Sequence, residues 1–220
     1  MSTPFVEHVA ERAARVDLVL GAREVAALTK YFELLRAWNR QINLTALPLE
    51  PATDEALDRL LVEPLAAARV LARRPQVTQS AIPRWIDLGS GGGSPAIPMK
   101  VALPSLHLTM VESKSRKAAF LREVVRALRW EDVDVVNARF ESLAERSGSA
   151  ELLTVRAVRV DAELARLAAD LLGEQGLLLV FQSRQNQPDL QGFSKVAVER
   201  LLAELPSWLH VYSRLFHVEQ

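Results

Sequence analysis

Residues 85–93 read Trp-Ile-Asp-Leu-Gly-Ser-Gly-Gly-Gly, an apolar segment that ends in an acid and runs into a glycine-rich turn. Glycine adopts backbone dihedrals that a Cβ forbids, and it lets backbone N–H groups approach a ligand closely. A turn of this kind after the first strand of a parallel sheet is where open α/β proteins bind nucleotide-like ligands. We therefore expect a buried strand at 84–88 and a ligand site at the turn that follows it.

The spacing of the glycines indicates which ligand this is. A dinucleotide-binding fingerprint has the pattern G-x-G-x-x-G, and counted from Gly89 its third glycine would fall on Ser94. The chain has D-x-G-x-G-x-G instead, from Asp87 to Gly93. This pattern favours S-adenosylmethionine, whose amino-acid end needs open backbone and a nearby acid rather than a pyrophosphate cradle. A strand–turn–helix corner without a ligand is the alternative interpretation.

Beyond Pro83, segments with strand and helix character alternate, which indicates βαβ crossovers and an α/β fold with a mainly parallel sheet. The expected strands are 84–88, 106–111, 133–137, 151–156, 176–181 and 210–218, of which the last could enter antiparallel. The expected helices are 96–102, 114–129, 161–172 and 194–204.

The first 80 residues have a helical periodicity instead. Apolar residues recur on one face of a helix within 6–38, and Gly21 separates a short first helix from a longer second one. Another helix is expected over 53–73, where Pro64 should kink or split it. The expected organisation is a helical extension, 1–80, and an α/β domain, 81–220, that together form one compact unit.

The composition excludes several kinds of chemistry. The chain of 220 residues has no cysteine, so disulfides, thiolate zinc sites and cysteine-held iron–sulfur clusters are excluded. Radical use of S-adenosylmethionine and C5 methylation of pyrimidines through a cysteine adduct are excluded with them. The four histidines lack the spacing of metal ligands, and we expect no metal.

Charge and hydropathy limit the possible partners. Lys plus Arg and Asp plus Glu number 27 each, so affinity for RNA must come from a local patch or a shared partner surface. No apolar run is long enough for a membrane span, and the N-terminus lacks the features of a signal peptide. We expect a cytoplasmic protein that acts as a monomer and does not bind membranes.

Polar residues at the ends of later strands are candidates for the same site. Glu112 ends the second strand, where a carboxylate can accept the hydroxyls of a ribose; a solvated charge is the alternative. Phe140 and Glu141 follow the third strand, where an adenine edge would lie, although Phe140 could equally be a core residue. Arg156 ends the fourth strand among apolar residues, which points to a cofactor or substrate contact or to an ion pair.

The segment 114–129 carries six basic residues and one acid. Arg122, Arg126 and Arg129 share one face of the expected helix and could contact RNA phosphates, as could Asn39 in the loop after the N-terminal helices. A solvated helix face is the alternative interpretation.

We find no catalytic dyad, and no Asn/Asp-Pro-Pro-Tyr/Phe motif follows the fourth strand. That motif serves the methylation of exocyclic amines. An acceptor such as guanine N7 already has a nucleophilic lone pair and loses no proton. Catalysis could then rest on positioning alone, without a catalytic residue.

Four stretches of the sequence together resemble the RsmG (GidB) family of bacterial 16S rRNA guanine-N7 methyltransferases. They are Trp38-Asn39-x3-Asn43-Leu44-Thr45; Asp87-Leu88-Gly89-Ser90-Gly91-Gly92-Gly93-Ser94-Pro95-Ala96-Ile97-Pro98; Glu112-Ser113-x2-Arg116-Lys117-x2-Phe120-Leu121; and Arg156-Ala157-Val158. They extend over nearly the whole chain. The glycine stretch that runs on to Ile97-Pro98, taken with the Glu-Ser motif, is more specific than a generic cofactor loop.

The resemblance implies a Rossmann-like class I methyltransferase with a helical N-terminal extension. It implies S-adenosylmethionine as the methyl donor and a guanosine N7 in small-subunit rRNA as the acceptor. Together with the residue patterns, it gives the expected cofactor-binding residues Gly89, Ser90, Gly91, Gly93, Ser94, Glu112, Phe140, Glu141 and Arg156.

The chain departs from the family at several positions. Leu60 stands where histidine is usual, Glu63 where aspartate is usual, and Gln182 where lysine is frequent. The changes at Leu60 and Gln182 motivate an alternative hypothesis, a non-catalytic RNA-binding or ribosome-binding module on a methyltransferase fold. An NAD-dependent oxidoreductase is a second alternative, against which Ser94 argues.

Overall fold

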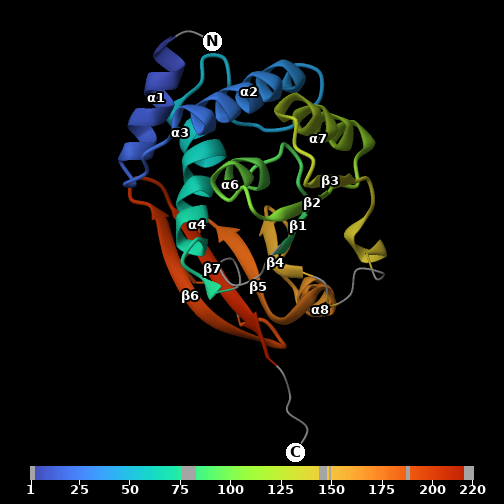
Figure 1. Ribbon diagram of the computed structural model, residues 1–220. Coiled ribbons are helices and arrows are strands. Elements are labelled where there is room, and N and C mark those ends of the chain that lie inside the picture. The colour runs from blue at the N-terminus through green and yellow to red at the C-terminus, as the bar shows by residue number, and fades with distance from the viewer. Residues whose placement is uncertain (1–2, 76–82, 144–147, 149, 187–188, 216–220) are drawn as a thin grey trace, which may run out of the picture.

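The computed structural model describes residues 3–75, 83–143, 148, 150–186 and 189–215. A seven-stranded sheet with the order β3-β2-β1-β4-β5-β7-β6 forms its centre (Figure 1). The strands are β1 Arg84–Leu88, β2 His107–Val111, β3 Val133–Val136, β4 Ala150–Arg156, β5 Leu172–Gln182, β6 Phe193–Leu202 and β7 Ser207–Arg214. The first five strands are parallel, and β7 is antiparallel to both β5 and β6.

The order of the strands places a ligand site at β1. This strand pairs with β2 on one side and with β4 on the other, so the sheet grows outward in both directions from it. Open α/β sheets bind ligands at the carboxyl ends of the strands at such a switch point. The expected α/β fold with a mainly parallel sheet is confirmed, and so is the antiparallel entry of the last strand.

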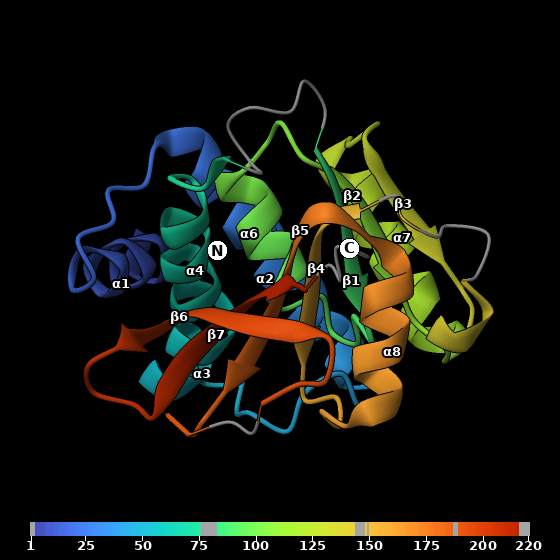
Figure 2. The same cartoon turned by 90° about the horizontal axis from the view of Figure 1, so that it is seen from below.

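Helices cover the two faces of the sheet unequally. Helices from the N-terminal third, with α6 and α7, lie on one face, and α8 lies on the other (Figures 1 and 2). Alternate residues of β5 face the two sides, since Leu177 and Leu179 join the larger core and Leu178 and Val180 the smaller. The helices are α1 Thr3–Ala14, α2 Ala22–Asn39, α3 Asp54–Leu57, α4 Glu63–Leu71, α6 Ala96–Ala102, α7 Ser115–Leu128 and α8 Ala162–Leu171.

Gly21 separates α1 from α2, as expected. It is the N-cap of α2, and its N–H donates to the carboxylate of Glu24 three residues on. The face of α2 that is buried repeats at the spacing of an amphipathic helix: Leu28, Tyr31, Phe32 and Leu35.

The helix expected over 53–73 is a continuous helical run over 54–71 that changes type along its length. The predicted kink or split takes the form of a π-helical segment just before Pro64. Thr53 caps α3, accepting a hydrogen bond from the Ala56 N–H at 3.2 Å. A π-helical segment, Asp58–Val62, follows and runs directly into α4, whose first turn contains Pro64. The Glu63 N–H donates to the Asp58 carbonyl, five residues back. Segments of this kind are frequent at functional sites.

The helix expected over 194–204 is wrong, because most of this segment forms strand β6. Its Ala, Glu and Arg residues favour a helix locally, but partly buried and exposed side chains alternate along it. Antiparallel pairing with β7 satisfies its backbone and overrides that local preference. The last strand also begins and ends earlier than expected, and residues 216–218 of that prediction lie outside the described residues.

Candidate functional site

The glycine turn at the end of β1 has the backbone that the sequence predicts. Gly89, Gly91 and Gly93 have φ values of +75°, +53° and +86°, in the region that favours glycine. A Cβ on Gly93 would lie 2.3 Å from the Ile97 side chain, so close packing against α6 also requires glycine there. A Cβ on Gly91 would meet nothing closer than the Gly89 carbonyl at 3.7 Å. Gly91 therefore borders open space.

Glu112, at the end of β2, holds this turn from the other side. One of its carboxylate oxygens accepts from the Gly91 N–H at 2.9 Å, and the other accepts from the Lys114 N–H at 2.7 Å. Each oxygen keeps a lone pair beyond these bonds. The carboxylate is thus fixed in place, with capacity left to accept hydroxyl groups from a ligand.

Asp87 lies behind the turn and is almost fully buried. The Thr154 hydroxyl donates to one oxygen of its carboxylate, and the Trp85 indole N–H donates to Thr154 at 2.9 Å. Burial raises the pKa of Asp87 to about 6, against the opposing effect of hydrogen bonds from Ser90 and Thr154. The second carboxylate oxygen has no protein partner among the described residues.

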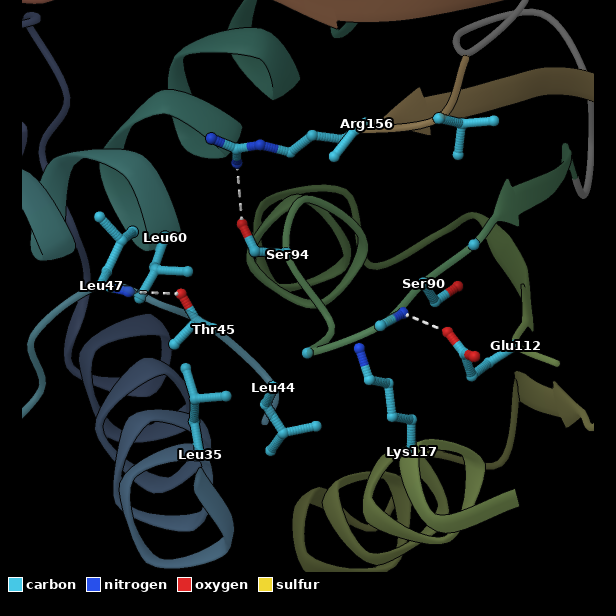
Figure 3. Close-up of a pocket in the computed structure, with 15 residues that line it drawn as sticks. Leu35, Leu44, Thr45, Leu47, Leu60, Ser90, Ser94, Glu112, Lys117 and Arg156 are labelled. Carbon is cyan, nitrogen blue, oxygen red and sulfur yellow. Dashed lines mark hydrogen bonds between the residues drawn. The ribbon is translucent and has the colours of Figure 1, made fainter. Parts of the chain in front are cut away.

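A pocket of about 420 Å³ opens beside the turn (Figure 3). Six of the nine residues expected to bind a cofactor line it: Gly89, Ser90, Gly91, Ser94, Glu112 and Arg156. The sequence did not predict the other nine: Leu35, Leu44, Thr45, Leu47, Leu60, Gly92, Lys117, Ala157 and Val158. The structure therefore brings the predicted strand ends together and adds a wall from the N-terminal third of the chain.

The loop after α2 forms much of that additional wall, and Asn39 holds it. The Asn39 side-chain oxygen accepts from the N–H groups of Leu44 and Thr45 at 2.9 and 3.0 Å, and its nitrogen donates to the Thr45 carbonyl at 3.1 Å. Both ends of this amide are therefore engaged within the loop. A direct RNA contact by Asn39 stays a prediction, and the Asn-Leu-Thr motif is the sequence signal that points to the loop.

The N-terminal helices also support the turn directly. The buried Tyr31 hydroxyl donates to the Gly92 carbonyl at 2.7 Å, and burial raises the pKa of Tyr31 far above its usual value. A Cβ on Gly92 would lie 3.0 Å from the Leu44 carbonyl. The N-terminal helical extension therefore packs on the glycine turn of the α/β domain, while the boundary at residue 80 stays a prediction.

Arg156 ends β4 and forms an ion pair, one of the contacts that the sequence left open, while its contact with a cofactor or substrate stays a prediction. Its guanidinium forms an ion pair with Glu63, and it also lines the pocket. One nitrogen donates to the Arg59 carbonyl at 2.7 Å and to the Ser94 hydroxyl at 3.1 Å, and Figure 3 shows the second of these hydrogen bonds. The ring of Phe181 lies 5.9 Å from the guanidinium carbon.

Lys117 extends from α7 toward the glycine turn (Figure 3). Within the described part of the chain, its ammonium group has no hydrogen-bond or ion-pair partner in the protein. With Arg156 it gives the lining two cations, against one acid, Glu112. The Arg-Lys pair of the Glu-Ser motif is the sequence signal for this position.

The predicted site residues Gly93 and Phe140 lie outside the pocket lining. Gly93 packs against α6, and Phe140 packs against the smaller core from a short 3₁₀ helix, Phe140–Ser142. The side chain of Glu141 lies outside the described part of the structure. The cofactor roles of these three residues stay predictions.

The predicted RNA-binding arginines are exposed on α7 or at its end. Arg126 forms an ion pair with Glu123 at 2.7 Å, and Arg122 reaches the Val135 carbonyl at 3.5 Å. Arg129 ends the helix in a left-handed conformation. Their contact with RNA stays a prediction.

The described residues contain no cluster of three or more His, Asp or Glu side chains arranged to hold a metal ion. None of the helices in this part of the chain combines the length and the apolar character needed to cross a bilayer.

Similar structures have the same architecture. The yhhF protein from Escherichia coli, named as a candidate methyltransferase, superposes with a TM-score of 0.58 at 18% identity and covers 78% of this chain and 92% of its own. TYW2 from P. horikoshii, solved in complex with MeSAdo, gives a TM-score of 0.52 at 13% identity over 71% of this chain and 62% of its own. At these identities the likeness shows the fold alone, which is the expected Rossmann-like α/β fold.

The sequence comparisons are more specific. A family profile described as rRNA small subunit methyltransferase G matches residues 24–203. The ribosomal RNA small subunit methyltransferase G of Stenotrophomonas maltophilia is 38% identical over 74% of this chain and 71% of its own length. That of Xanthomonas axonopodis pv. citri is 35% identical over 81% of this chain and 78% of its own. The chain therefore belongs to the rRNA small subunit methyltransferase G family.

Proposed function

We propose that this protein transfers a methyl group from S-adenosylmethionine to N7 of a guanosine in small-subunit (16S) rRNA. Family membership supports the reaction class and the kind of RNA. The observation that carries the proposal is the pocket at the carboxyl ends of the strands, where Glu112 fixes the Gly91 N–H beside open space.

The groups around the pocket fit this donor. Glu112 has lone pairs free for ribose hydroxyls, and the turn at Gly91 has no side chain to obstruct a ligand. The Arg156 guanidinium can donate to a carboxylate such as that of an amino-acid moiety. The donor, when bound, supplies an electrophilic methyl group on a sulfonium.

Among the described residues of the lining, Glu112 is the only carboxylate, and its two oxygens hold backbone N–H groups. Guanine N7 needs no base, because its lone pair attacks directly and no proton leaves. The protein then contributes by holding the acceptor at near-attack distance and by excluding water. Leu44, Leu47 and Leu60 form an apolar wall suited to the face of a purine.

RNA recognition is proposed to come from local groups, since the formal net charge is zero. The unpaired ammonium of Lys117 at the pocket, and the exposed Arg122, Arg126 and Arg129 on the same helix, are the candidate phosphate contacts. The 16S rRNA or the small ribosomal subunit is the proposed partner.

Tritiated methyl transfer from S-adenosylmethionine tests the function. The acceptors are naked 16S rRNA and small ribosomal subunits from cells that lack this protein. We expect label in at least one acceptor, and chemical cleavage at N7-methylguanosine should then map it to a guanosine. Binding of the donor without incorporation into either acceptor would support the non-catalytic alternative and contradict the proposal.

A further inference from the structure

Glu63 is a buried acid next to the pocket that does not line it. It begins α4, directly after the π-helical segment, and only 2% of its surface is exposed. Its carboxylate accepts from three side chains: Arg156, the Ser207 hydroxyl, and Arg59 at 3.1 Å. These partners come from three different elements, so this carboxylate joins α4 to the ends of β4 and β7.

The contacts of Glu63 fix the position of Arg156 at the pocket. Arg156 uses one nitrogen for Glu63 and the other for the Ser94 hydroxyl and the Arg59 carbonyl. Ser94 and Arg156 both line the pocket, whereas Glu63 lies behind them and does not. Glu63 therefore acts on the pocket by holding the arginine and compensating its charge, without lining the pocket itself.

The charge of Glu63 matters because of what the pocket is proposed to bind. Among its described residues, the lining has two cations, Lys117 and Arg156, and one acid, Glu112. A sulfonium donor carries a positive charge, which an uncompensated arginine would repel. The negative charge of Glu63 offsets the positive charge of Arg156, although Glu63 also pairs with Arg59. Because charges are poorly screened in the protein interior, this compensation is strong.

We propose that Glu63 is a positioning residue that sets the charge selectivity of this pocket: it holds Arg156 against Ser94 and compensates its charge. The pocket can then use the arginine as a hydrogen-bond donor and still accept a cationic sulfonium ligand. This inference rests on the proposed function. It predicts that Glu63 favours S-adenosylmethionine over S-adenosylhomocysteine, which has the same shape but a neutral thioether.

The test is the ratio of two dissociation constants, measured by calorimetry for S-adenosylmethionine and S-adenosylhomocysteine. In Glu63→Gln, which keeps the shape and removes the charge, we expect affinity for the sulfonium to fall about ten-fold more than affinity for the thioether. Glu63→Asp keeps the charge and should stay within about two-fold of the wild-type ratio. A purely structural role would weaken both ligands equally.

Two further variants keep the test decisive if Glu63→Gln does not fold. Arg156→Gln removes the cation and should shift the ratio in the opposite direction, toward the sulfonium, even if both ligands bind more weakly. Asp58→Asn alters a buried ion pair away from the pocket and should leave the ratio unchanged.

The outcomes separate the two proposals. If the wild-type protein binds both ligands and neither Glu63→Gln nor Arg156→Gln changes the ratio, the inference about Glu63 is wrong and the proposed function stands. If the wild-type protein binds neither ligand, the proposed function itself fails. An Asp58→Asn variant that changes the ratio as much as Glu63→Gln would also overturn the inference, because the effect would then be nonspecific.

Discussion

Two buried ion pairs each join an arginine to an acid of the N-terminal helical region, and they differ in what else the arginine contacts. Arg12 of α1 pairs with Asp58, with further contacts to Asp54 and Glu204. The hydrogen bond to Asp58 raises the pKa of Arg12. Arg156 pairs with Glu63, and its other nitrogen reaches Ser94 on the pocket wall.

The comparison shows that burial of an ion pair is not in itself a sign of function. Both pairs place an arginine against an acid that is less than a tenth exposed. Arg12 donates its hydrogen bonds to the carboxylates of Asp54 and Asp58, neither of which lines the pocket. Arg156 has a partner that lines the pocket, so a change in its network reaches a ligand.

The largest loss of ligand affinity is expected from a substitution that fills the space where the ligand is proposed to bind. Gly91→Asp adds a side chain at φ +53°, facing the pocket and close to the Glu112 carboxylate. We expect calorimetry to detect no binding of S-adenosylmethionine, while circular dichroism shows the helices intact. Gly192→Asp is the matched control, since Gly192 also has a positive φ and a Cβ there would meet no atom within 4 Å. Unchanged affinity in Gly91→Asp would contradict the assignment of the site.

The next largest effect is expected from breaking the ion pair between Arg12 and Asp58. Asp58→Ala leaves Arg12 buried without its main partner, and breaking a buried pair in this way costs about 3–5 kcal/mol of stability. Denaturant unfolding should show this loss. The folded fraction should bind S-adenosylmethionine with wild-type affinity. A large loss of affinity per folded molecule would show that the Arg12 and Arg156 ion pairs are coupled. It would contradict the conclusion that only the Arg156 pair affects the ligand.

A third buried acid, Asp87, accepts a hydrogen bond from a hydroxyl group and should respond to pH. Burial raises the pKa of Asp87 from 3.8 to about 6. Between these values the folded state keeps a proton that the unfolded state has lost, so this group lowers stability as pH rises from about 4 to 6, by roughly 2–3 kcal/mol. Stability measured against pH should fall less over this range in Asp87→Asn than in the wild-type protein. Parallel curves would show that Asp87 titrates normally.

The smallest effect is expected in the loop that lines the pocket. Asn39→Ala removes three hydrogen bonds to the loop backbone and should cost about 1–2 kcal/mol of stability. We expect slower methyl transfer with unchanged affinity for the small subunit. Asn43→Ala, at an exposed position in the same loop, is the control. If Asn39→Ala weakens RNA binding instead, the predicted direct RNA contact is correct.

The sequence predicted those parts of the site that depend on local chemistry. A positive φ requires glycine at Gly89, Gly91 and Gly93, and a strand that ends in Glu112 places its acid at the sheet edge. The wall made by Leu44 and Leu60 could not be predicted from spacing, because it depends on how the N-terminal helices pack.

Long-range pairing limited the prediction in two further places. Glu63 and Arg156 are separated by 93 positions, and nothing local to either residue indicates the other. The error at 194–204 has the same cause, since that segment is extended only because β7, which lies later in the chain, pairs with it. Local preference decided the turns, and tertiary contacts decided the partners.

The π-helical segment Asp58–Val62 determines how the acids of the two ion pairs are oriented around the helix axis. Asp58 begins it and Glu63 follows its end, so the two acids that bind Arg12 and Arg156 are joined by one short stretch of widened helix. In an α-helix, residues five apart differ by about 140° around the axis, whereas the i→i+5 hydrogen bond of this π-helical turn brings Asp58 and Glu63 nearer to one face. The width of this segment, as well as its side chains, therefore decides how the two acids lie relative to each other and to the pocket.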